Sequence, residues 1–269
     1  MKVVDLTRPL VSGMPVFPGD PPVAVERVRT HDEDGFEVSR VCVGSHSGTH
    51  VDAPRHFFPE GATLDEFPAG RFVGRGVIVD LRQTRPEGRE DRPPAPTGAA
   101  LAPEAAPAEL APAGPMGAEA AGAEGRPPVV GSARPAVAGP VLDLDPAVGP
   151  SPVLVDATFL AERLRNCPLM RGDMTLLWTE GAFLTADAAR LLLDAGVVLV
   201  GTDGDSLDPR ESAHGYGYPV HQLLLGHGVL LAEGLCNLDE LGPGPVTCAF
   251  LPLAIAGVDG APLRAVAWR

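Results

Sequence analysis

Residues 45–58 read SHSGTHVDAPRHFF, a stretch that holds four candidate ligands: His46, His50, Asp52 and His56. In a straight strand these positions of equal parity would face one side, but His46 and His56 would lie about 33 Å apart. Gly48 can adopt backbone angles that other residues avoid, and Pro54 fixes its own φ angle. The stretch therefore predicts a bent, extended segment whose imidazoles and carboxylate converge on one point.

Neutral imidazole and carboxylate together suit zinc, manganese and iron(II). The motif differs from the zincin HExxH because no glutamate follows His46, and because Gly48 and Thr49 disfavour a helix. The alternatives are a hydrogen-bonded polar turn and a chance grouping. The chain has only seven histidines, so three within eleven positions are improbable by chance. We interpret the stretch as a metal site.

A catalytic metal usually has further protein ligands and one position open for water. His221 opens a predicted short helix at residues 219–228, and Glu233 lies in an otherwise apolar predicted strand, VLLAEGL. A carboxylate in such a strand is costly unless it is paired or bound to a metal. For Glu233 the sequence alone leaves metal ligation and a solvent-facing or arginine-paired strand end open. The remaining histidines are expected in a helix cap, a loop and a turn: His227, His214 and His31.

Composition narrows the class of protein. Hydrophobic residues make up 45% of the 269 residues, which indicates a globular protein with a sizeable core. The net charge of −14 argues against nucleic acid and against an anionic membrane surface as partners. The amino terminus lacks the apolar core of a signal peptide, and no apolar run could span a bilayer. The four cysteines form no CxxC pair, so we expect small buried side chains in a reduced, cytoplasmic protein.

One segment differs sharply from the rest of the chain. No aromatic residue occurs between Phe72 and Phe159, and Ala, Pro, Gly and Glu dominate about residues 85–150. Such a segment cannot bury enough apolar surface to offset the entropy lost on ordering. We expect a single domain over residues 1–269 that carries a low-complexity, Ala/Pro-rich, flexible insertion without chemical function.

Hydrophobic periodicity predicts an α/β domain built on a mixed sheet. Residues 23–30 and 36–44 alternate as two strands of a hairpin around the acidic turn HDEDG. Helices are predicted at residues 157–167, 185–196 and 219–228, with Asp156 and Thr185 as N-caps. Strands are predicted at residues 74–82, 173–179, 197–203 and 229–235, and residues 247–257 are expected to be the final strand. The alternation of strands and helices in the second half, with hairpins in the first, gives this fold class.

The stretch SHSGTHVDAPRHF resembles the H-x-G-T-H-x-D-x-P-x-H motif of the cyclase family of metal-dependent hydrolases, which includes bacterial kynurenine formamidases. Four further segments resemble other parts of the family in the same order: MPVFPGD, GTDGDSLDPRES, PVHQLLLGHGVLLAEGLCNLDEL and LPLAIAGVDGAPLRAVA. The resemblance covers nearly the whole chain outside the insertion. It implies a swivelling β/β/α domain that assembles into homodimers or homotetramers, with the active site near a subunit interface.

The resemblance also implies roles for single residues. His46, His50 and Asp52 match ligands of a first metal, and Asp52 matches a carboxylate that can bridge to a second. His221 and Glu233 match the downstream ligands. His56 matches the proton donor and acceptor, and Phe17 stands where formamidases often carry a tryptophan against the substrate ring.

We therefore expect a metal-dependent hydrolase that attacks a small cyclic or aryl amide, such as an aryl formamide, with metal-activated water. One or two divalent ions per subunit are expected, with zinc as the first choice and manganese as the alternative. A second hypothesis is a metal-dependent cyclase or dehydratase of a secondary-metabolite pathway. A third, a non-enzymatic ligand-binding relic, is disfavoured by the intact ligand set and by His56.

Overall fold

The computed structural model of the chain describes residues 2–82, 153–209 and 217–269. The predicted insertion at about residues 85–150 lies outside the described residues, as do His214 and the last residues of GTDGDSLDPRES. No helix within the described ranges is long and apolar enough to cross a membrane.

An eight-stranded mixed sheet forms the centre of the fold, with the strand order β1-β12-β11-β5-β7-β9-β10-β4. The four strands from β5 to β10 in this order run parallel, and all other neighbours are antiparallel. Strand β4 also pairs with β12, so the sheet closes on itself. The bounds are β1 Val3–Asp5, β4 His50–Asp52, β5 Val73–Asp80, β7 Met174–Trp178, β9 Leu199–Thr202, β10 Leu230–Glu233, β11 Gly244–Pro252 and β12 Gly260–Trp268.

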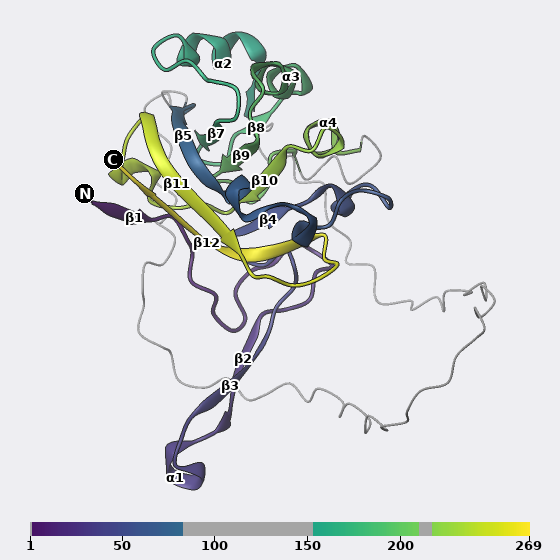
Figure 1. Ribbon diagram of the computed structural model, residues 1–269, viewed down its shortest axis with the longest axis vertical. Helices are drawn as coiled ribbons and strands as arrows, with labels where there is room; N and C mark the ends of the chain where they lie inside the picture. Colours follow the sequence, from purple (N-terminus) through teal and green to yellow (C-terminus); the bar gives the residue numbers. More distant parts are fainter. Residues whose placement is uncertain (1, 83–152, 210–216) are drawn as a thin grey trace, which may run out of the picture. The chain divides into compact units, whose positions relative to one another are not determined.

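Three helices lie along one side of the parallel strands (Figure 1): α2 Ala157–Leu164, α3 Ala186–Ala195 and α4 Pro219–Gly226. The predicted caps are present, since Asp156 accepts from the Phe159 N–H and Thr185 from the Ala188 N–H. Two short parallel strands precede α2 and α3, β6 Leu154–Val155 and β8 Phe183–Leu184. Four 3₁₀ helices also occur among the described residues: Pro54–His56, Leu64–Glu66, Ala69–Phe72 and Leu238–Glu240. The α/β class with a mixed sheet is confirmed.

Side chains alternate between two hydrophobic cores on the two faces of the sheet. The core beneath the helices contains Val77, Leu177, Val200 and Leu231 from the strands, together with Leu160, Leu192 and Leu224 from the helices. The core on the other face contains their strand neighbours Ile78, Leu176, Leu199 and Leu230, together with Val51, Phe250 and Ala265. The face that a strand residue occupies therefore follows from its parity, which matters for the candidate ligands on β4 and β10.

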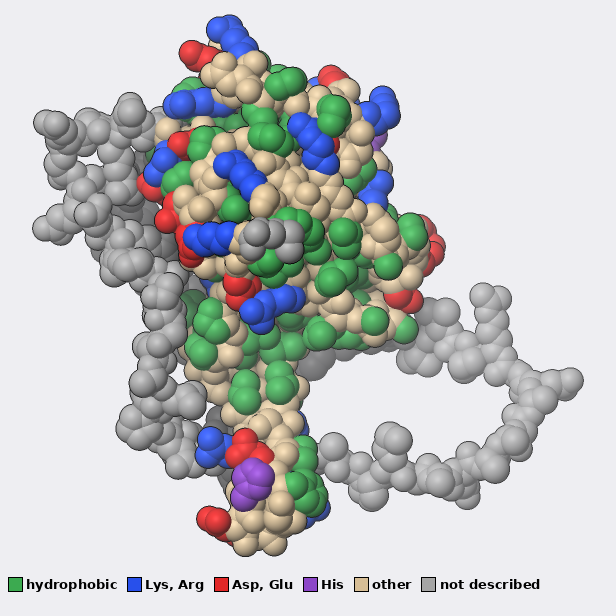
Figure 2. Space-filling model, turned by 60° about the vertical axis from the view of Figure 1, so that its left-hand side comes forward, with side chains coloured by type: hydrophobic (Ala, Val, Ile, Leu, Met, Phe, Trp, Pro, Cys, Tyr) green, Lys and Arg blue, Asp and Glu red, His purple; other side chains and the backbone are tan. Residues whose placement is uncertain are grey.

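The predicted hairpin forms an arm of β2 Ala24–Arg29, α1 His31–Asp34 and β3 Val38–Cys42. The acidic turn is a single helical turn, which Thr30 caps and which ends at Gly35 in the left-handed region. In Figure 1 the arm runs clear of the eight-stranded sheet, and none of its three elements contains a buried residue. Hydrophobic side chains are exposed along it, as Figure 2 shows.

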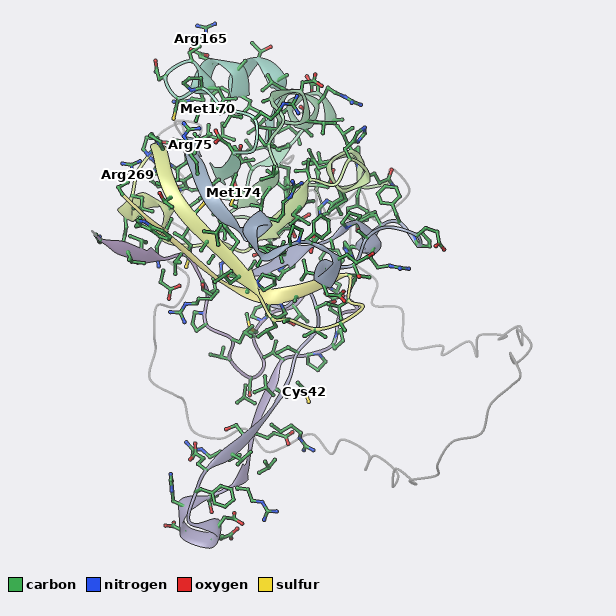
Figure 3. The ribbon with its side chains drawn as sticks, in the orientation of Figure 1. Cys42, Arg75, Arg165, Met170, Met174 and Arg269 are labelled. Carbon is green, nitrogen blue, oxygen red and sulfur yellow. The ribbon has the colours of Figure 1, made fainter. Side chains whose placement is uncertain are left out.

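Two expectations are wrong. Residues 247–257 are not the final strand, because β11 ends at Pro252 and the chain returns as β12 between β11 and β4. Gly260 and Pro262 hide the strand character of this last segment in the sequence. Of the four free cysteines only Cys248 is buried, against Met174, whereas Cys42 lies exposed on the arm (Figure 3).

Candidate metal centre

The stretch that carries the first candidate ligands consists of a turn, the short strand β4 and the 3₁₀ helix Pro54–His56. Gly48 has a φ angle of +65°, and a Cβ atom added there would lie 2.7 Å from Cδ2 of Leu10. Only glycine therefore fits this turn without strain or displacement. The predicted bend is present, because the rings of His46 and His56 lie 3.9 Å apart between centroids.

Strand pairing brings Glu233 to the same place. Glu233 lies directly opposite His50, and Leu231 lies opposite Asp52, on the antiparallel strands β10 and β4. Residues that are directly opposite share a face of the sheet. Since Leu231 faces the helices, His50, Asp52 and Glu233 face them as well. There His221 of α4 approaches both carboxylates, with Nε2 3.2 Å from Oε1 of Glu233 and 3.8 Å from Oδ2 of Asp52.

The four side chains that meet here are buried, with exposed fractions between 1% and 6% for Asp52, His221, Glu233 and His50. Nε2 of His50 lies 3.4 Å from Oδ1 of Asp52 and 3.7 Å from Oε2 of Glu233. Within the described part of the chain, every ion-pair partner of Asp52 and Glu233 is a histidine. A buried carboxylate without a cationic partner is costly, so this arrangement needs protonated imidazole or a metal ion.

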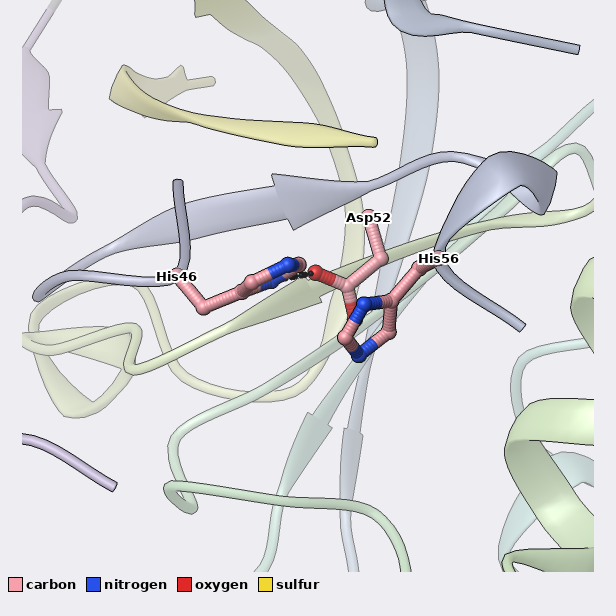
Figure 4. Close-up of side chains that lie close together, drawn as sticks. All are labelled: His46, Asp52 and His56. Carbon is pink, nitrogen blue, oxygen red and sulfur yellow. Dashed lines mark hydrogen bonds and ion pairs between the residues drawn. The ribbon is translucent and has the colours of Figure 1, made fainter. Parts of the chain in front are cut away.

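The ligand atoms form two groups that share Asp52. In each group the atoms lie within 4.8 Å of one another, and the groups are His46–Asp52–His56 and His50–Asp52–Glu233. Figure 4 shows the first group, in which the loop before β4 supplies His46 and the 3₁₀ helix supplies His56. Nδ1 of His46 lies 2.7 Å from Oδ1 of Asp52. The shared carboxylate could bridge two ions or complete the shell of one.

Each histidine of the centre also contacts an acceptor outside these groups. Nδ1 of His50 donates to the Gly48 carbonyl at 3.0 Å, and Nδ1 of His221 donates to Oδ2 of Asp208 at 2.7 Å. Nε2 of His46 and Nδ1 of His56 donate to Asp259. A neutral imidazole that donates from one nitrogen keeps a lone pair on the other. Metal-binding histidines usually have such outer partners, which fix the tautomer and the orientation of the ring.

The sequence did not single out Asp208 and Asp259. Asp208 is buried and also accepts the backbone N–H groups of Val220 and His221, so it holds the first turn of α4 together with the imidazole. Both aspartates lie in family-like segments, GTDGDSLDPRES and LPLAIAGVDGAPLRAVA. A carboxylate next to Val258 and Gly260 in the apolar second segment was the signal that could have found Asp259.

Opposing effects of burial and charge set the pKa values of these side chains. Burial lowers the pKa of His46 and of His221, but the neighbouring carboxylates outweigh it and raise both values to about 10. The same balance raises the pKa of His50. Burial raises the pKa of Asp52, yet His46 and His50 hold it well below its usual range. His56 differs, because burial dominates and lowers its pKa.

The remaining candidate residues lie in the following places. Phe17 is half-buried in the amino-terminal segment, and its role in substrate binding stays a prediction. His227 ends α4, where its Nδ1 donates to the Leu223 carbonyl, as expected for a cap. Two aromatic residues that the sequence did not suggest, Phe57 and Tyr218, contact the ring of His221 at centroid distances of 5.2 and 5.8 Å.

Comparisons with known proteins agree with this fold. The family model named Cyclase matches residues 4–114. Kynurenine formamidase of Paracidovorax citrulli is 32% identical over 263 residues, which cover 97% of this chain and 94% of that protein. The enzyme of the same name from Salinibacter ruber is 29% identical over 269 residues, 99% of this chain and 97% of that protein.

Among solved structures, isatin hydrolase A from Labrenzia aggregata has the same fold. Its TM-score is 0.67 at 21% sequence identity, with 99% of this chain and 93% of that chain covered. The curated relatives match over nearly the full length of both chains. The chain therefore belongs to the cyclase family together with these kynurenine formamidases, and it is an amidohydrolase of the cyclase type.

Proposed function

We propose that this protein hydrolyses a small aryl amide, an aryl formamide or a related cyclic amide, with the help of one or two divalent ions. The observation that carries the proposal is the pair of buried carboxylates, Asp52 and Glu233, whose ion-pair partners among the described residues are histidines. The similarity to kynurenine formamidases at 32% and 29% identity supports the substrate class.

The donor set fits a divalent ion. His50 and His221 each donate Nδ1–H to an outer acceptor and turn Nε2 toward the carboxylates, as metal-binding histidines do. The residues that would hold the ion or ions are His46, His50, Asp52, His221 and Glu233. Imidazole with carboxylate favours zinc and also suits manganese. A bound ion would supply a Lewis acid, which polarises the substrate carbonyl and lowers the pKa of water.

His56 supports the proton transfers that amide hydrolysis needs. The overall reaction adds water across the C–N bond, so the acyl carbon gains oxygen and the departing nitrogen gains a proton. Because Nδ1 of His56 donates to Asp259, its Nε2 is the atom that would accept a proton and deliver it to that nitrogen. The side chain is 31% exposed, unlike the buried ligands, so it can reach a substrate.

An aromatic substrate is also supported by the side chains around the centre. Phe57 and Tyr218 lie 5.4 Å apart and both contact His221, so they present aromatic surface beside the carboxylates. Aromatic rings prefer offset or edge-to-face neighbours at such distances. Phe17 is the further residue proposed to contact the substrate ring, from the amino-terminal segment.

A panel of substrates tests the proposal. The zinc-loaded protein is assayed with an aryl formamide, with isatin and with a lactone, while metal content is measured on the same sample. We expect release of formate from the formamide at a rate that metal removal abolishes. Turnover of none of them by fully loaded protein would refute the proposal and favour the cyclase or dehydratase alternative.

We also infer that the chain associates with a second copy of itself through the arm of residues 24–42. A two-stranded hairpin is marginally stable alone, and this one exposes Val25, Val28, Phe36, Val38 and Val41. The arm, together with the surface that it would meet on the second copy, approaches the roughly 20–30 residues that each partner contributes to a standard interface. Homo-oligomers with twofold symmetry are the commonest assemblies.

Light scattering after size exclusion tests the association. We expect the wild type to be a dimer or tetramer, and Val41→Glu to be smaller because a charge would enter the interface. Met170→Glu is the matched control, since Met170 is similarly exposed but lies outside the arm. A monomeric wild type, or equal masses for all three proteins, would contradict this inference.

A further inference from the structure

One carboxylate, that of Asp259, contacts two histidines of the metal centre at once. Its Oδ2 accepts from Nε2 of His46 at 2.9 Å and from Nδ1 of His56 at 3.2 Å. The two imidazole rings are tilted by 38° against each other at a centroid distance of 3.9 Å. The residue proposed to bind metal and the residue proposed to move protons therefore share one acceptor atom.

The backbone fixes the position of Asp259 relative to both histidines. Its carbonyl accepts the Ala53 N–H at 2.8 Å, and the next residue, Gly260, pairs with Asp52 in the sheet. A Cβ atom added at Gly260 would lie 2.8 Å from Cε1 of His46, so the chain passes close to that ring. Asp259 is thus attached to the ligand segment through its main chain and through its side chain.

We propose that Asp259 is a positioning residue that sets the tautomers and orientations of His46 and His56. A carboxylate can only accept, so Nε2 of His46 and Nδ1 of His56 must carry the hydrogens. Both nitrogens of His46 face carboxylates and carry hydrogens without a metal; when His46 gives up one hydrogen to bind an ion, Asp259 keeps the other on Nε2 and leaves the lone pair on Nδ1, toward Asp52. The lone pair of His56 lies on Nε2. This inference rests on the proposed function for the catalytic role of His56, but its structural part does not.

Two simpler roles for Asp259 fit the geometry less well. As a ligand it would need to lie beside Asp52, but the two carboxylates contact opposite nitrogens of the His46 ring. As a purely stabilising ion pair it would contribute little, because its side chain is 35% exposed and such pairs are weak in water. Removal of the carboxylate should therefore affect the centre more than the stability of the fold.

Three measurements on Asp259→Ala and Asp259→Asn test the proposal, with Asp5→Ala as the matched control. Asp5 is a half-exposed aspartate of β1 that pairs with Arg264, and the hydrogen bonds of its carboxylate among the described residues go to Thr7 and Arg264 and not to a histidine of the centre. The measurements are zinc affinity by competition with a chromophoric chelator, nitrogen-15 NMR of the histidine rings in metal-free protein, and steady-state kinetics with an aryl formamide. Melting temperatures show that each variant is folded, and Asp259→Asn serves if the alanine variant is not.

We expect both Asp259 variants to lose about 10- to 100-fold in zinc affinity, the usual effect of removing an outer partner of a ligand. His56 should carry its hydrogen on Nδ1 in the wild type and in Asp5→Ala, and should lose that preference in Asp259→Ala. The kcat value should fall while KM changes little. The proposal would be overturned if the Asp259 variants had the same zinc affinity and the same His56 tautomer as Asp5→Ala. If only one of these two properties changed, the shared role of Asp259 toward His46 and His56 would be overturned.

The proposed function can fail separately. If the wild type hydrolyses no substrate of the panel, the catalytic proposal is refuted, while zinc affinity and the NMR spectra still decide the role of Asp259.

Discussion

His50 and Glu233 lie directly opposite each other on the antiparallel strands β4 and β10, with Nε2 of His50 3.7 Å from Oε2 of Glu233. This register brings a candidate ligand from the first motif next to a candidate ligand from a segment far along the chain. A slip by one residue would turn the ligands of one strand to the opposite face. The proposed metal centre therefore depends on the pairing of β4 with β10.

Removal of a ligand should remove both metal and activity. His50→Ala and Asp52→Ala each delete one donor from the buried group and leave its neighbours without their partner. We expect a loss of zinc content and a fall in activity of more than about 100-fold. Metal analysis beside a formamide assay measures both. His227→Ala is the matched control, because its exposed imidazole donates to the Leu223 carbonyl and belongs to neither group of candidate ligands. Full zinc occupancy in both ligand variants would show that the assignment is wrong.

His56→Ala should separate metal binding from catalysis. The half-exposed His56 lies at the edge of the first ligand group, and the other histidine and carboxylate donors remain in the variant. We expect most of the metal to stay bound, while kcat falls at least about 100-fold and KM changes less. Metal content and kinetics are measured on the same preparation, beside His31→Ala from the arm. If metal and activity disappear together, His56 is a structural ligand instead.

Metal uptake should release protons. At neutral pH the metal-free protein holds protons on His46 and His221, whose pKa values are about 10, and a metal ion needs their lone pairs. Protons compete with the ion below that pKa, so zinc affinity should rise with pH from about 6 toward 9. Calorimetric titration in two buffers of different ionisation enthalpy should show the release of about one proton for each histidine bound. An affinity that does not depend on pH would contradict pKa values of about 10 for His46 and His221.

Gly260→Ala should disturb His46 without replacing any of the proposed ligands. The new Cβ would lie 2.8 Å from Cε1 of His46 and 2.8 Å from the Val51 carbonyl oxygen, so ring or backbone must shift. We expect lower zinc affinity and a loss of about 1–3 kcal/mol in the free energy of unfolding. Gly70→Ala is the control, since nothing lies within 4 Å of an added Cβ there. Equal zinc affinity in the two variants would show that His46 can give way without consequence.

Much of the fold could be predicted from local sequence patterns. The helices α2, α3 and α4 follow from apolar periodicity and from the caps at Asp156 and Thr185, because these effects act over a few residues. The closure of the sheet could not be predicted, since it depends on β4 pairing with both β10 and β12. β12 itself was missed because Gly260 and Pro262 weaken its strand character in the sequence. In the sheet these two residues lie opposite Asp52 and His50 of β4.

The site divides in the same way. The stretch at residues 45–58 is rich in candidate ligands, and the bend at Gly48 could be predicted from the sequence. That bend brings the rings of His46 and His56 together. Asp208 and Asp259 act on the histidines from other segments, and a single carboxylate in a loop carries no pattern that names its partner. The predicted insertion at about residues 85–150 lies outside the described residues and stays a prediction.

The most direct test of metal-dependent hydrolysis is a titration of chelator-treated protein with Zn²⁺, in which formate release from an aryl formamide is followed at each addition. Manganese is titrated in parallel. We predict no hydrolysis without metal, then a rise in rate that is proportional to added zinc and levels off at one or two ions per chain. Hydrolysis by the metal-free protein at the rate of the loaded protein would contradict the account.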